Sequence, residues 1–175
     1  MNNISIYIFT TFGFTLLSTI YLFYRASQQS KVFLILISSW IILQSILGIS
    51  GCYQVTNSEV PRFQLLLLPP LFIILFLFST KNGRVFIDKL DLKTLTIIHI
   101  VRLFIEVVLY WLFIAKAVPQ LMTFEGRNFD IIAGITAPII YYFVFVKTMM
   151  NKSILLVWNI LCLGLLINIV VNGLL

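Results

Sequence analysis

Charged residues are scarce in this sequence. Asp, Glu, Lys and Arg together make up 10% of its 175 residues, whereas apolar residues make up 61%. A water-soluble domain usually has about a quarter of its residues charged. A chain with so few charges cannot cover the surface of a soluble fold, so most of its apolar residues must face hydrocarbon. The low charge therefore predicts an integral membrane protein.

Residues that build redox, metal and nucleophilic sites are equally few. The two cysteines, Cys52 and Cys162, lie far apart without CxxC spacing, and His99 is the only histidine. These counts argue against a disulfide scaffold and a zinc site, and one histidine cannot supply bis-histidine haem ligation within a monomer. No GxxxxGK[ST], HExxH or GxSxG motif is present. We therefore expect neither a metal nor a cofactor.

Continuously apolar runs are what the sequence has in abundance. In hydrocarbon every backbone N–H and C=O must be paired within the protein, which leaves helices or closed barrels. Barrel strands alternate apolar and polar residues, but the stretch 65–78 is apolar throughout, so we expect an all-α bundle. A spanning helix needs about 20 residues. Six windows meet or approach that length and predict a single transmembrane domain over residues 1–175: 4–24, 32–52, 63–79, 94–116, 131–146 and 154–173.

The positions of Lys and Arg predict the orientation of the six windows. The first, third and fifth loops hold eight of these residues and the second and fourth hold three: Arg25, Lys31, Lys81, Arg84, Lys89, Lys93, Lys147 and Lys152 against Arg62, Lys116 and Arg127. An excess of positive charge marks cytoplasmic loops, so we expect both termini on the outer side of a cell membrane. This distribution accounts for the net charge of +6 without a nucleic-acid partner.

The third predicted loop, 80–93, is the longest polar stretch of the chain. We interpret it as a solvated cytoplasmic loop whose basic residues attract anionic headgroups. Docking of a soluble partner is the alternative interpretation.

The window 94–116 carries a polar stripe formed by His99, Arg102, Glu106 and Tyr110. On an α-helix these side chains project within about 80° of one another and extend over about 16 Å. A charged side chain inside a span costs about 2.5–3.5 kcal/mol or more, so this face should point at protein or at a watery cavity. An internal ion pair between Arg102 and Glu106, at i,i+4 spacing, is one interpretation. The other is that the stripe lines a binding site or a proton path.

The fourth predicted loop concentrates charge, because residues 122–130 read Met-Thr-Phe-Glu-Gly-Arg-Asn-Phe-Asp. Asn128 or Asp130 suits the N-cap of the next helix, and Gly126 suits a turn with positive φ. Glu125 and Arg127 are explained by neither role. Because the loop follows the outer end of the polar stripe, we interpret four of its residues as an outer gate that folds back over a cavity: Glu125, Arg127, Asn128 and Asp130.

Amides and prolines inside the other windows are secondary candidates. Gln44 lies in the second window, and Asn159 and Asn168 lie in the sixth. Interhelical hydrogen bonds are the usual role of such amides. Pro69 and Pro70 should break or bend the third helix.

The pattern His99-x-x-Arg102-x-x-x-Glu106, followed by Pro119 and the motif at 122–130, resembles small uncharacterised bacterial integral membrane proteins. The resemblance covers roughly residues 99–172 and includes Trp158-Asn159 and Asn168. It implies a bacterial inner membrane and carries no activity with it.

Three functions remain open on the sequence. In the first, the stripe binds a small solute or relays protons in transport. In the second, the chain is a membrane-embedded enzyme acting on a lipid or a quinone-like molecule, with Glu106 or His99 as acid–base group. In the third, the stripe mates with a partner helix in a homo- or hetero-oligomer, and the chain is a structural subunit.

Overall fold

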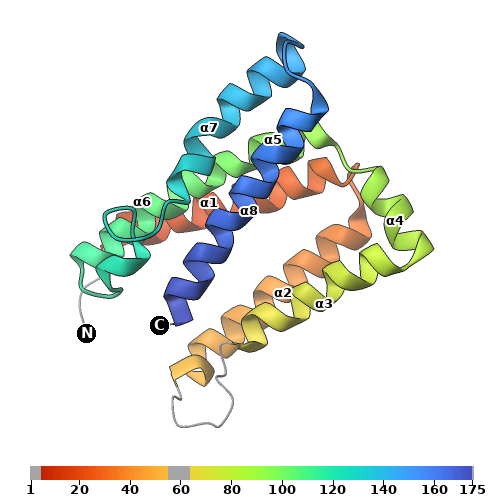
Figure 1. Ribbon diagram of the computed structural model, residues 1–175. Helices are drawn as coiled ribbons and strands as arrows, with labels where there is room; N and C mark the ends of the chain where they lie inside the picture. Colours follow the sequence, from red (N-terminus) through yellow and green to blue (C-terminus); the bar gives the residue numbers. More distant parts are fainter. Residues whose placement is uncertain (1–4, 55–63, 175) are drawn as a thin grey trace. The chain divides into compact units, whose positions relative to one another are not determined.

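The computed structural model describes residues 5–54 and 64–174. Residues 55–62 of the predicted second loop, including Arg62, and the starts of the first and third windows at Ile4 and Phe63 lie outside these residues. The described residues form helices and no strands: α1 (Ile6–Ala26), α2 (Lys31–Ile49), η1 (Cys52–Gln54), α3 (Gln64–Ser79), α4 (Lys81–Asp88), α5 (Leu92–Ile97), η2 (Ile98–Ile100), α6 (Val101–Ile114), η3 (Gln120–Met122), α7 (Ile131–Tyr141), η4 (Tyr142–Val146) and α8 (Lys152–Leu174) (Figure 1). The all-helical prediction is confirmed.

Four helices are long and apolar enough to cross a membrane. They are Ile6–Ala26, Lys31–Ile49, Leu92–Ile114 and Lys152–Asn172, and α3 with α4 makes a fifth if the bent pair is counted as one span. The fifth window, 131–146, forms an apolar helix that is shorter than the others. The described residues therefore contain four or five candidate spans by length and composition.

The third helix and the polar stretch after it both differ from expectation. Of the break or bend predicted at Pro69 and Pro70, the break is wrong, because α3 continues through both residues. In hydrocarbon, continuing the helix keeps the remaining backbone groups paired. The stretch 80–93, predicted to be a solvated loop, is largely helical, because it contains α4 and the start of α5. Thr80 caps α4: its hydroxyl accepts a hydrogen bond from Gly83 N at 3.2 Å. Helices α3 and α4 meet at a bend of 96° (Figure 1).

The chain divides into two compact units, Tyr24–Asp91 and the remainder formed by Met1–Phe23 and Leu92–Leu175. The expectation of one transmembrane domain over the whole chain stays a prediction. The larger unit is held together by α7, which packs against α5, η2 and α6.

A glycine allows α6 and α7 to approach closely. A Cβ placed on Gly134 would lie 2.8 Å from the backbone N of Leu103. Only glycine fits this contact without displacing one helix. Ala137, one turn further along α7, is fully buried, so small residues define the seam that positions the polar stripe.

Candidate functional site

Each member of the polar stripe contacts a residue from another segment of the larger unit. The segment between α6 and α7 folds back against α6 (Figure 1). Its residues meet Arg102, Glu106 and Tyr110, while α8 meets His99 and Arg102. The structure therefore brings together three predicted groups: the stripe, part of the predicted gate and the sixth window.

Arg102 forms its ion pair with Asp130. The Arg102 Nη1 atom lies 2.6 Å from Asp130 Oδ1, and the two side chains are 18% and 8% exposed. Nη1 also donates to the backbone O of Cys162 on α8 at 3.2 Å. The interpretation that paired Arg102 with Glu106 is thus wrong in its partner. Among helical i,i+4 pairs, the order with the acid on the N-terminal side is the more favourable one, and here the base comes first.

Glu106 is buried and only half satisfied. Its residue is 1% exposed. Oε1 accepts a hydrogen bond from Asn128 Nδ2 at 2.5 Å, whereas Oε2 is buried and has no hydrogen-bond partner. Asn128 is itself fully buried and also donates to the backbone O of Met122 at 3.1 Å. A carboxyl group with one unpartnered oxygen is costly in a dry environment, so Oε2 is an atom of the stripe to which a proton or a ligand could bind.

The two ends of the stripe contact aromatic rings. His99 lies against Trp158 of α8 with ring centroids 4.8 Å apart, and its Nδ1 is buried without a hydrogen-bond partner. Tyr110 lies against Phe124 of the folded-back segment with centroids 5.0 Å apart. Aromatic pairs at these distances pack favourably, so Trp158 and Phe124 close the stripe at opposite ends.

These contacts place the segment between α6 and α7 alongside a candidate span. Glu106, which bonds Asn128, precedes the end of α6 at Ile114 by eight residues, a rise of about 12 Å. The chain therefore returns by about that distance along α6 before it reaches Asn128, and α7 begins just afterwards, with Asp130 paired to Arg102. This return explains why the apolar helix from Ile131 is shorter than the other candidates. Irregular backbone at such a depth is tolerated only where protein or a water-filled cavity surrounds it.

The returning segment satisfies its own backbone. The N–H groups of Gly126 and Asn128 both donate to Thr123 O, at 2.9 and 3.3 Å, and Thr123 is fully buried. The backbone O of Arg127 accepts from Asn168 Nδ2 of α8 at 2.6 Å. The amide of Asn168 therefore bonds the folded-back segment, a role that the expectation of bonds between helices did not include.

One local expectation for this segment is wrong, and a second is met in position only. Gly126 does not have the predicted positive φ; a glycine is needed there because a Cβ would lie 2.8 Å from the Cα of Leu121. Asp130 occupies the N-cap position of α7 but makes no capping bond, because its carboxylate is paired with Arg102. Asn128 Oδ1 instead accepts from Asp130 N at 3.0 Å.

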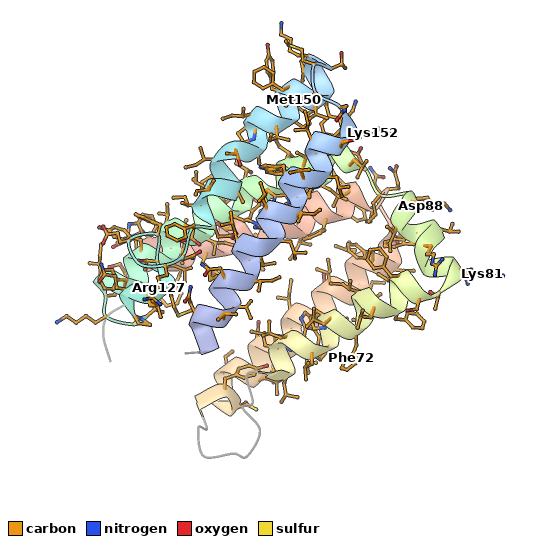
Figure 2. The ribbon with its side chains drawn as sticks, in the orientation of Figure 1. Phe72, Lys81, Asp88, Arg127, Met150 and Lys152 are labelled. Carbon is orange, nitrogen blue, oxygen red and sulfur yellow. The ribbon has the colours of Figure 1, made fainter. Side chains whose placement is uncertain are left out.

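The remaining candidates lie apart from this cluster. Glu125 and Arg127 are exposed, and Figure 2 labels Arg127 in the folded-back segment. Asn159 donates to Leu155 O within its own helix at 2.8 Å, so the predicted interhelical bond is wrong here. In the smaller unit, Gln44 Oε1 accepts from the hydroxyl of Tyr53, just beyond the end of α2.

Sequence reasoning missed four members of the cluster: Thr123, Phe124, Trp158 and Cys162. Trp158 and Phe124 belong to motifs noted in the sequence. In a chain rich in aromatic residues, however, the sequence does not indicate which of them contact the polar stripe. No group of three or more His, Cys, Asp or Glu side chains suited to a metal ion occurs in the described part of the chain. Comparisons with protein families, with curated proteins and with solved structures find no match.

Proposed function

We propose that the chain is a multi-pass membrane protein with six membrane segments, of which the one containing α7 is completed by the folded-back segment. The odd loops lie in the cytoplasm and both termini lie outside. Hydrogen bonds between the first and third loops support a shared side, because Asp91 N donates to Ala26 O at 2.9 Å and Gln28 Nε2 donates to Lys89 O at 3.3 Å. Their excess of Lys and Arg supports the cytoplasmic assignment.

We further propose that Glu106 binds a proton or the donor group of a small solute during transport. The observation that carries this proposal is the unpartnered, buried Oε2 on a candidate spanning helix. Intramembrane ionisable residues usually mark substrate or proton pathways. Arg102 is committed to Asp130, so the fold supplies Glu106 with one amide donor and no cation. A proton on Oε2, or a donor from a solute, would complete the coordination of this carboxyl group.

The folded-back segment is the gate in this proposal. Asn128 covers Glu106, and Asp130 fastens the same segment to α6 through Arg102. Movement of the segment would remove Asn128 and Asp130 from the stripe together. Arg102 lies one helical turn from Glu106, so the guanidinium would have a second carboxylate to pair with after the gate opens. The exchange of partners keeps the arginine neutralised in both positions.

The substitution Glu106→Gln tests this function, with Glu125→Gln as the matched control on an exposed carboxylate. Gln retains the acceptor for Asn128, so the fold should persist. Infrared spectra of the purified protein should show a protonated carboxyl band that Glu106→Gln loses and Glu125→Gln keeps. In liposomes loaded with a pH-sensitive dye, Glu106→Gln should lower proton uptake at least tenfold, a loss of about 1.4 kcal/mol or more in transition-state stabilisation. Wild-type uptake by Glu106→Gln would overturn the proposal.

A structural role is the second candidate, and a specific observation favours it. Arg102, Asp130, Asn128 and Asn168 all hold the folded-back segment in place. If the cluster serves only this purpose, Glu106→Gln should change the unfolding midpoint and leave the infrared band and proton movement as in the wild type.

A further inference from the structure

The smaller unit carries a basic surface at one end. Its members come from three stretches of sequence and are all exposed: Arg25, Lys31, Lys81, Arg84 and Lys89. The acidic residues among the described residues of this unit are Asp88 and Asp91. The surface therefore has an excess of positive charge, and we call it the basic end.

Contacts between the turns bring these residues together. The bonds from Asp91 N to Ala26 O and from Gln28 Nε2 to Lys89 O join the turn after α1 to the turn after α4. The rings of Phe33 in α2 and Phe86 in α4 lie 5.6 Å apart. Basic residues more than fifty positions apart thus share one end of the unit.

The geometry of α4 suits a membrane surface. Because the axes of α3 and α4 differ by 96°, α4 lies close to the membrane plane when α3 crosses the bilayer. Lys81, Arg84 and Asp88 project within about 60° of one another on α4, whereas Gly83 is buried and Phe86 faces α2. Figure 2 shows Lys81 and Asp88 at opposite ends of α4. A helix with this arrangement is typical of the interface between headgroups and acyl chains.

The neighbouring helices fix the depth of the basic end. None of the residues in the spanning window of α2 is buried within the protein, which suits a helix surrounded by hydrocarbon. Lys31 begins α2 and Lys81 follows α3. The basic end therefore begins where the apolar helices stop, which is the level of the lipid headgroups.

We propose that the basic end binds anionic phospholipid headgroups and anchors α4 in the membrane interface. Charge complementarity carries the proposal, since phosphate groups at this level match the excess of Lys and Arg. The occupant is a lipid surface, because the basic residues adjoin apolar helix ends instead of forming a patch distant from them. Val85, 52% exposed beside Lys81, provides an apolar side chain for the same interface.

The test uses the whole protein in dodecyl maltoside micelles, titrated with phosphatidylglycerol or phosphatidylcholine and analysed for retained lipid by native mass spectrometry. Wild type should retain phosphatidylglycerol preferentially. The variant Lys81→Gln/Lys89→Gln should lower the apparent affinity for it about 25-fold, because each cation near a lipid surface contributes about fivefold. The control Lys147→Gln/Lys152→Gln removes the same charge from exposed positions in the predicted fifth loop, outside the basic end. Because only these two cations lie there, it should lower the affinity much less than the variants of the basic end do.

The melting temperature in lipid-free micelles shows whether each variant is folded. If Lys81→Gln/Lys89→Gln is unfolded, Arg25→Gln/Lys31→Gln decides, since it removes two cations of the basic end from different elements and should give the same loss. Equal retention of the two lipids by the wild type would overturn the proposal. So would equal losses in the control and in the variants of the basic end, because the effect would then follow from net charge alone.

Discussion

Removing the carboxylate of Asp130 should destabilise the folded protein by about 3 kcal/mol. The substitution Asp130→Asn leaves the Arg102 guanidinium without its ion-pair partner at a site where the arginine side chain is 18% exposed. Breaking a buried pair by removing one partner costs about 3–5 kcal/mol, because the remaining charge stays buried. We expect the lower end of this range, because the Cys162 carbonyl still accepts from Arg102.

A double-mutant cycle separates this pair from its neighbours. Arg102→Met should also cost about 3 kcal/mol, since it leaves Asp130 buried and unpaired. The double variant should cost about 3 kcal/mol instead of 6, giving a coupling energy of about 3 kcal/mol, at the upper end of the range for contacting residues. The parallel cycle of Arg102→Met with Glu106→Gln should give a smaller coupling energy, because the structure records no bond between these side chains.

The assay is reversible unfolding in mixed micelles, followed by the fluorescence of the three tryptophans. Additive costs for Arg102→Met and Asp130→Asn, within about 0.5 kcal/mol, would refute the pairing. A larger coupling energy between Arg102 and Glu106 would show that the sequence-based pairing is the one that stabilises the fold.

Two further predictions concern the backbone. Gly134→Ala should lower the free energy of unfolding by about 1–3 kcal/mol, because the added methyl group overpacks against Leu103. The control Gly164→Ala, where a Cβ would meet nothing within 4 Å, should raise the free energy of unfolding. Equal effects of the two substitutions on the unfolding midpoint would contradict the close contact between α6 and α7. Lys116 lies two residues beyond the end of α6 and has a φ of 58°. Ala117 N donates to Leu112 O at 2.8 Å, as in a helix end at which glycine is favoured. Lys116→Gly should therefore stabilise the protein by about 0.5–1 kcal/mol, and a lower midpoint would argue against the left-handed conformation.

The ends of the helices could be predicted from the sequence, because they lie where apolar residues give way to charged ones. The first window was expected at 4–24 and the helix runs Ile6–Ala26; the sixth was expected at 154–173 and the helix runs Lys152–Leu174. Apolar runs that end at charged residues define where hydrocarbon meets water, and a helix is the structure that pairs its own backbone there. The turn chemistry was less accessible, since Gly126 serves a close approach and not a positive φ.

Only the part of the candidate site that lies on one helix could be predicted from the sequence. Periodicity alone places His99, Arg102, Glu106 and Tyr110 on one face, because a helix repeats about every 3.6 residues. Periodicity within one helix says nothing of which residues return from elsewhere in the chain. Asp130 is distant from Arg102 in sequence, and nothing local distinguishes it from an N-cap.

The sequence by itself determined that this chain is helical, that its helices suit a membrane, and that one of them carries ionisable groups on a single face. Those properties follow from composition and spacing, which act residue by residue. Only the tertiary structure decided that Arg102 pairs with Asp130 and that Asn128 covers one oxygen of Glu106. The reason is physical: a buried charge is neutralised by whichever opposite charge the packing of helices brings within reach, and here the close contact at Gly134 starts α7 beside Arg102.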